Sequence, residues 1–472
     1  ENKLYRVAVE MTKEDDHLIF DFSTSSPQSP RFINCTIAGL LGAVYCSMFP
    51  ILAYDLPWNA GVLRPIKVIA PEGLVVNAAW PAPVSLGAVG VIWLSEMICV
   101  EALSKLTACS TTMANEAHAN PPGAPDIFRV MGMDQFGEFF GGPLLDMGWM
   151  GEAAYQHRDG LTSRGAHISS QQFLPNVERI EGSMPLLYLY RQLRPDTGGA
   201  GRRRGGQSAS NGWAVHDTKA IGVIPGGHGF EMPNSQGRFG GYPGACNQRT
   251  LLRNTDIKEW LASGRLPNGI RELAGEEQIL AAQPGRLTFG PDDCYEMCPM
   301  PGGGWGDPTA REPDLVAEDL VGQVITADVA RDLYGVAIGA DGSADLAATS
   351  ELRERIHSQR ASWPRGLAWD GPTASLGDVL HPLGEGLEVV RAGDSSVTRC
   401  TGCGFILSPG DANWKPYAGK KLASASDLGP FIRLHADLEA RQYACPGCGL
   451  LLGLEILTAD TPPLWDIQLR LG

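Results

Sequence analysis

Apolar and polar residues alternate near the start of the chain with the period of two that is typical of half-buried strands. Residues 5–9 and 17–22 have this pattern on either side of a polar turn, which predicts a β-hairpin. Residues 35–54 and 86–106 are longer apolar runs with few charges, and they predict two buried helices. A short strand is expected within residues 64–73, where a Pro-x-Gly turn ends it.

The middle of the chain has a weaker pattern. Residues 110–175 are rich in Gly, Met, His and Asn beside aromatic residues, which is typical either of loops that line a pocket or of an irregular surface lobe. The pocket candidates in this region are Asp146, His157 and His167. Strand-like alternation returns over residues 176–224.

Helix signals are clear over residues 313–335, where an acidic start precedes apolar residues on one face. Thr326 is expected to cap the second of two helices in this stretch. Residues 337–375 mix charge with Gly, Ser and Pro, and they predict a short helix and a linker. The expected division is therefore a first domain over residues 1–336, this connector, and a terminal module over residues 376–472.

The terminal module contains two CxxCG turns, at residues 400–404 and 445–449. Two thiolates three residues apart can hold one side of a metal ion, and two such pairs complete a tetrahedral site. Four protein ligands leave no open position for a substrate, so the sequence predicts a structural zinc site. The alternative is a pair of disulfides, which needs an oxidising compartment. The predicted ligands are Cys400, Cys403, Cys445 and Cys448.

Composition narrows the class of protein. The 472 residues carry a net charge of −15, which makes a nucleic-acid partner a poor prediction because phosphate contacts need clustered Lys and Arg. The other seven cysteines are scattered through mostly apolar surroundings, which fits a reducing cytosol better than secretion. No apolar run of membrane-spanning length is present, so a cytoplasmic protein without a membrane segment is expected.

Three further motifs are interpreted as structural. The glycine-rich stretches at residues 198–201 and 302–306 lack the sequence of a phosphate-binding loop, and tight turns are expected there. The basic cluster at residues 202–204 is interpreted as a solvated or paired loop rather than a phosphate site. Residue 1 is Glu and a strand is expected almost immediately after it, which indicates that the natural chain begins elsewhere.

Several of these stretches resemble the hydantoinase B / 5-oxoprolinase family. The resemblance is carried by FDFSxxSPQ at residues 20–28, NAGxxRPI at 59–66, LRPDTGGAGxxRGG at 193–206 and PGGGWGDP at 301–308. It implies a mixed α+β fold, in which a glycine-rich, multi-layer hydantoinase B-like scaffold precedes a small zinc-ribbon-like domain. The family's His/Asp metal motifs precede the FDFS-type segment, so those ligands match no position in this sequence.

The terminal module resembles the small gamma subunit of acetone and acetophenone carboxylases. The matching segments are NWKxYA at residues 413–418 and PPLWDI at residues 462–467, together with the two CxxCG turns. The two resemblances together imply ATP-dependent carboxylation of a ketone with bicarbonate.

The implied partners are a hydantoinase A-type ATP-binding subunit and the missing N-terminal part of a hydantoinase B chain. A divalent catalytic metal and ATP are expected elsewhere in that complex. Two alternatives stay open at this point. One is an ATP-dependent amidohydrolase of cyclic amides, and the other is an assembly chain without chemistry of its own.

Overall fold

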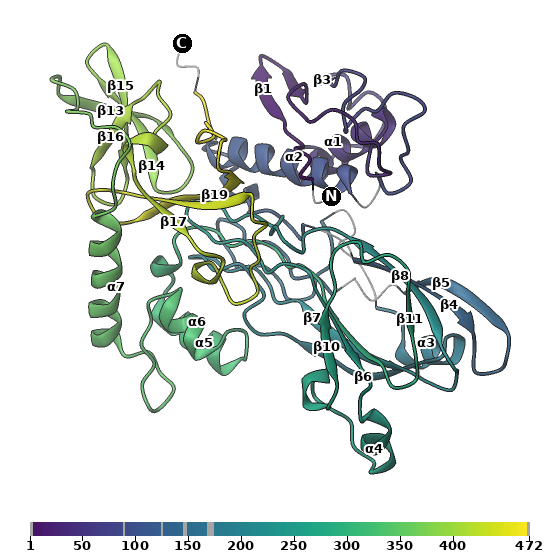
Figure 1. Ribbon diagram of the computed structural model, residues 1–472. Helices are drawn as coiled ribbons and strands as arrows, with labels where there is room; N and C mark the ends of the chain where they lie inside the picture. Colours follow the sequence, from purple (N-terminus) through teal and green to yellow (C-terminus); the bar gives the residue numbers. More distant parts are fainter. Residues whose placement is uncertain (1–2, 88–89, 124–125, 145–148, 168–173, 470–472) are drawn as a thin grey trace.

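The computed structural model describes residues 3–87, 90–123, 126–144, 149–167 and 174–469, and it has the predicted mixed α+β fold (Figure 1). No helix in these parts of the chain is both long enough and apolar enough to cross a bilayer. The helices are α1 (Ile37–Leu52), α2 (Val91–Ala108), α3 (Val177–Ser183), α4 (Ile257–Ala262), α5 (Pro313–Val321), α6 (Ala327–Asp332) and α7 (Leu346–Ala361).

Helices α1 and α2 pack against each other and against a small sheet at the N-terminal end of the chain (Figure 1). This sheet has the order β1 (Glu10–Glu14), β2 (His17–Asp21) and β3 (Ile66–Ile69). Both predicted helices and the predicted strand are confirmed. The first hairpin arm was placed wrongly at residues 5–9. The backbone amides of Arg6 and Ala8 bond instead to the hydroxyls of Ser26 and Ser25, which keeps this segment away from β2.

Two sheets enclose the central aromatic core. One has the order β10 (Glu276–Ile279), β9 (Gln248–Arg253), β12 (Cys294–Cys298), β7 (Ala209–Val215), β6 (Leu186–Leu193). The other has the order β11 (Leu287–Phe289), β8 (Ile221–Gly227), β4 (Asp126–Met133), β5 (Phe139–Leu144). Phe128, Trp213 and Tyr295 from both sheets pack together, with ring centroids 4.6–5.5 Å apart. The β4–β5 hairpin was not predicted, because glycines interrupt its alternating pattern.

Three glycine-rich segments pack main chain against main chain beside these sheets. A Cβ atom on Gly199 would lie 2.4 Å from the carbonyl oxygen of Tyr242, and one on Gly304 would lie 2.1 Å from that of Ala200. Such distances exclude every side chain larger than hydrogen. The stretches at residues 198–201 and 302–306, where tight turns were expected, instead pack closely against other main-chain segments. Within these two stretches only Gly306 has a left-handed conformation, at φ +73°.

Two arginines of the basic cluster are paired with carboxylates, which agrees with the prediction of a paired loop. Arg202 bonds Glu385 at 2.7 Å, and Arg204 bonds Asp319 at 2.8 Å. Asp319 lies on α5, and Thr326 caps α6 by accepting a hydrogen bond from the amide of Val329. Both helices over residues 313–335 are thus confirmed.

The C-terminal quarter of the chain forms two further sheets. One has the order β13 (Leu376–Pro382), β14 (Leu387–Ala392), β15 (Ser395–Cys400), β16 (Ile406–Pro409). The other has the order β17 (Gly419–Ala423), β18 (Leu438–Ala444), β19 (Leu451–Thr458). In Figure 1 the strands β17 and β19 reach from this part toward the centre of the molecule, and α7 descends beside it.

A fully buried carboxylate, Asp307, joins the C-terminal sheets and α7 to the glycine-rich layers. Its Oδ2 atom lies 2.8 Å from the guanidinium of Arg360 on α7 and accepts a hydrogen bond from the amide of Leu451 at 2.8 Å. Its Oδ1 atom accepts from the backbone amide and hydroxyl of Thr309. One side chain therefore contacts the first residue of β19, the last turn of α7 and its own loop.

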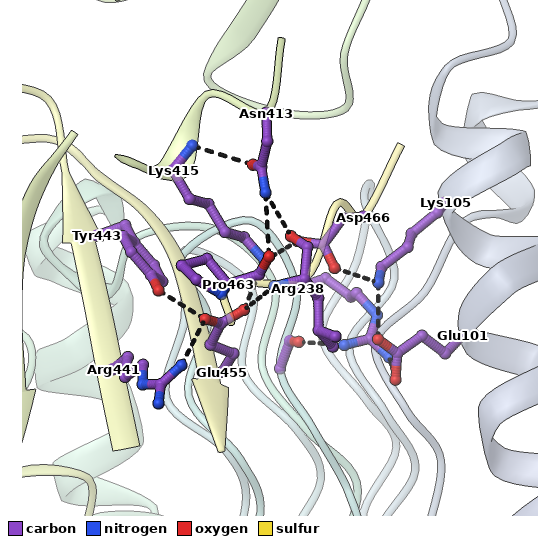
Figure 2. Close-up of polar contacts among 12 residues, drawn as sticks. Glu101, Lys105, Arg238, Asn413, Lys415, Arg441, Tyr443, Glu455, Pro463 and Asp466 are labelled. Atoms are coloured by element: carbon purple, nitrogen blue, oxygen red, sulfur yellow. Dashed lines mark hydrogen bonds and ion pairs between the residues drawn. The ribbon is translucent and has the colours of Figure 1, made fainter. Parts of the chain in front are cut away.

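A second junction links the C-terminal tail to α2 through a row of charges (Figure 2). The carboxylate of Asp466 contacts Lys105 of α2 at 2.7 Å, and its other oxygen contacts Lys415. Lys415 also bonds Glu455 of β19 at 2.7 Å, while Lys105 bonds Glu101 at 2.8 Å. The tail is thus clamped between the N-terminal helices and the C-terminal sheets.

The charges in this clamp shift one another's pKa values. Burial alone would raise the pKa of Asp466, but Lys105 and Lys415 hold it well below its usual range. Burial likewise opposes the ionised form of Glu101, and Arg238 and Lys105 still lower its pKa to about 2. Both carboxylates therefore stabilise the fold as anions.

The pH dependence of stability follows from these depressed values. The stabilisation that the two ionised carboxylates contribute to the folded state is fully present above the ordinary carboxyl pKa of about 4.5. It is lost as the pH falls through that value toward about 2. Replacing Asp466 by Asn leaves Lys105 and Lys415 without this anion. We expect it to cost about 2 kcal/mol at pH 7 and to flatten the acid side of the profile. The midpoint of urea unfolding at pH 7, 4 and 3 measures both effects. Asp460→Asn, at an exposed position near the tail, is the control. Equal midpoints for the two variants would contradict the clamp.

Candidate functional site

The four terminal cysteines meet at one point in the structure. The sulfur atoms of Cys400 and Cys448 are 3.8 Å apart, those of Cys403 and Cys445 are 3.6 Å apart, and all four lie within 4.8 Å of one another. These separations are too long for a disulfide. Sulfurs bound to one tetrahedral zinc ion lie about 3.8 Å apart, given a Zn–S distance of about 2.3 Å. The cluster could therefore hold a metal ion of this kind.

The two CxxCG turns are built alike. The amide of Gly404 bonds the carbonyl of Cys400 at 2.9 Å, and the amide of Gly449 bonds that of Cys445 at 2.8 Å. Both glycines have φ +74°, a left-handed conformation that favours glycine. The amide of Gly447 also donates to the sulfur of Cys445 at 3.3 Å. The turns thus direct backbone N–H groups toward sulfur, which favours the thiolate form.

The thiols are also polarised by one another. A hydrogen bond shared with Cys445 lowers the pKa of Cys400 to about 5, and the same bond raises the pKa of Cys445, which keeps the proton. Burial raises the pKa of Cys448 to about 12. A metal ion bound by the four sulfurs would displace the protons that the thiols carry.

The second turn lies directly against the rest of the protein. A Cβ atom on Gly449 would lie 2.0 Å from the carbonyl oxygen of His357 on α7. Two residues later, the amide of Leu451 is bonded to the buried carboxylate of Asp307. The cluster is therefore held at a fixed distance from the glycine-rich layers, by backbone contacts that tolerate no side chain.

The three predicted pocket residues, Asp146, His157 and His167, differ from one another in their surroundings. Asp146 lies outside the described residues. His157 is exposed, whereas the Nε2 atom of His167 is inaccessible to solvent. The ring of His167 lies 5.5 Å from that of His118, and Tyr155 lies between His118 and His157, at 4.9 and 5.9 Å. His118 was not among the predicted residues, because it is far from His167 in sequence and no local motif marks it.

The imidazoles of His118 and His167 both have lowered pKa values. Burial lowers the pKa of His118 to about 4 and that of His167 to about 3, so both rings are neutral at pH 7. Glu152 lies near these rings, and its carboxylate forms ion pairs with Arg158 and Arg164.

The seven cysteines outside the four-cysteine cluster have no disulfide partner.

Comparison with known proteins gives relatives that differ in activity, among them a carboxylase subunit and a caprolactamase subunit. The acetophenone carboxylase delta subunit of Aromatoleum aromaticum is 24% identical over 374 residues, covering 76% of this chain and 54% of that subunit. The caprolactamase subunit beta of Pseudomonas jessenii is 27% identical over 361 residues, covering 73% of this chain and 55% of that subunit. The chain thus spans about half the length of the curated relatives it matches.

The fold has a counterpart among solved structures. A nucleotide-free structure of acetone carboxylase, which carries out ATP-dependent acetone carboxylation, superposes on this chain with a TM-score of 0.67 and 25% sequence identity. The match covers 75% of this chain and 49% of that chain. The sequence profile of Hydantoinase B/oxoprolinase matches residues 1–308, nearly two thirds of the 472 residues. The chain belongs to the hydantoinase B/oxoprolinase family.

Proposed function

We propose that this chain is part of an ATP-dependent complex that carboxylates a ketone at its α-carbon with bicarbonate. The observation that carries the proposal is the joining of a hydantoinase B scaffold to a four-cysteine cluster within one chain, in a module whose sequence resembles the carboxylase gamma subunit. The similarity to an acetophenone carboxylase subunit and to an acetone carboxylase structure supports it. The proposed partners are a hydantoinase A-type ATP-binding subunit and a chain that supplies the rest of the hydantoinase B part.

The reaction explains why ATP is needed. The α-carbon of a ketone gives up a proton to form an enolate, which attacks the carboxyl carbon and makes the new C–C bond. Bicarbonate is a poor electrophile, so phosphorylation converts one of its oxygens into a phosphate leaving group. The developing enolate also needs positive charge or hydrogen-bond donors around its oxygen. The residues of this chain proposed near the substrate are those of the region 110–175, with His157, His167 and Asp146 as candidates.

Within this proposal, residues 376–472 form a module in which Cys400, Cys403, Cys445 and Cys448 bind structural zinc. The donor set and the sulfur separations fit a tetrahedral ion. The ion would stabilise the module and would take no part in the reaction. The catalytic divalent metal and ATP belong elsewhere in the complex, in a cytoplasmic setting.

The second candidate function is ATP-dependent hydrolysis of a cyclic amide. It is favoured by one observation, the similarity to the caprolactamase subunit beta, whose identity and coverage are comparable with those of the carboxylase subunit. A third candidate is an assembly chain whose chemistry lies in its partners. All three share the scaffold, so they are separated by their reactions.

The direct test uses the assembled complex with ATP and labelled bicarbonate, offered methyl and aryl ketones and a lactam in parallel. We expect ATP-dependent incorporation of label that remains after acid has removed free bicarbonate as carbon dioxide. ATP-dependent lactam opening without fixed label would instead establish the hydrolase. If the isolated chain were inert and made no contact with bound substrate in the complex, the assembly role would replace the proposed one.

The zinc assignment has its own test in Cys403→Ser and Cys448→Ser. We expect each variant to lose the bound ion and to leave residues 376–472 unfolded, because zinc affinity at such a site is also folding free energy. Metal content by mass spectrometry and limited proteolysis measure the two effects. Cys46→Ser, at an exposed cysteine, is the matched control. A wild-type chain that contained no metal and yet had a normally folded module would refute the assignment.

A further inference from the structure

His118 has a fixed tautomer. Its Nδ1 atom lies 2.7 Å from the carbonyl oxygen of Ala119. A carbonyl oxygen only accepts hydrogen bonds, so Nδ1 carries the proton and Nε2 carries a free lone pair. The side chain is buried, and within the described chain no donor reaches that Nε2 atom. A buried acceptor without a donor is costly, so it requires a partner.

The ring of His167 lies beside that of His118. Its Nε2 atom is also shielded from solvent and has no hydrogen-bond partner among the described residues. The centroids of the two rings are 5.5 Å apart, and their planes meet at 38°. Two imidazoles on one tetrahedral ion have centroids about 5.2 Å apart, given a metal–nitrogen distance of about 2.0–2.1 Å. The observed spacing is thus close to that of a shared ion.

We propose that His118 and His167 bind one divalent transition-metal ion through their Nε2 atoms. Neutral imidazole nitrogen suits zinc, cobalt, nickel and iron. The Nδ1–H of His118 donates to a backbone carbonyl, which is the second-sphere contact that orients a metal-ligating histidine. This site is distinct from the four-cysteine cluster and does not depend on the proposed carboxylase reaction.

The proposed site lies in a buried environment that contains charged side chains. Two protein nitrogens leave coordination positions that water or other ligands would have to fill. Glu152 supplies negative charge close by, and Arg158 and Arg164 fix its position.

The test is a cobalt titration of the full chain with zinc already in its four-cysteine cluster. We expect one additional equivalent of Co²⁺ per chain, detected by calorimetry and by visible absorption bands of nitrogen-bound cobalt. His118→Ala and His167→Ala should each weaken this binding by at least about 100-fold. His157→Ala removes an exposed histidine of the same ring cluster and should leave it unchanged.

A measurement without substitution guards against misfolded variants. In the unmutated chain labelled with ¹⁵N-histidine, added Zn²⁺ should shift the unprotonated Nε2 resonances of two of the nine histidines. Absence of an extra equivalent of cobalt, or no Nε2 shift, would overturn the proposal and leave a bridging water as the partner of the two lone pairs. Cobalt binding that persists in both His118→Ala and His167→Ala would overturn it as well.

Discussion

The structure depends on one buried carboxylate, that of Asp307. A charge with no exposed surface is tolerated only when it is paired and fully hydrogen-bonded, and Asp307 meets this condition with groups from three parts of the chain. Burial opposes its ionisation, yet the pKa of Asp307 is lowered, with Arg360 as the main opposing charge. The scaffold therefore cannot satisfy this side chain without α7 and the start of β19 in place.

Because Asp307 needs these hydrogen bonds, the four-cysteine cluster is packed in a fixed position against the scaffold. The amide of Leu451 donates a hydrogen bond to Asp307, and Leu451 follows Cys448 by three residues. The second CxxCG turn is therefore held next to this carboxylate. The charge row from Lys105 through Asp466 to Lys415 fixes the opposite end of the same module (Figure 2). The cysteine cluster, the tail and the glycine-rich layers are thereby joined through Asp307 and the charge row.

The sequence predicted features whose causes are local. Helices α1 and α2 follow from long apolar runs, the cap at Thr326 from its hydroxyl, and the cysteine quartet from two repeated turns. It did not predict features that depend on distant partners. The glycines at residues 198–201 and 302–306 pack against other main-chain segments, and this need is not visible in a single stretch. Likewise, His118 becomes a candidate ligand only because the fold brings its ring next to that of His167, 49 positions later in the sequence.

The central claim is that Asp307 couples the module to the scaffold, and hydrogen–deuterium exchange of Asp307→Asn tests it most directly. Asn cannot balance the charge of Arg360, so we expect faster exchange in both residues 346–361 and residues 438–458. Asp328→Asn, at an exposed carboxylate on α6, should leave both segments unchanged. Faster exchange confined to the loop of residues 301–308, with α7 and the module as slow as in the wild type, would contradict the account.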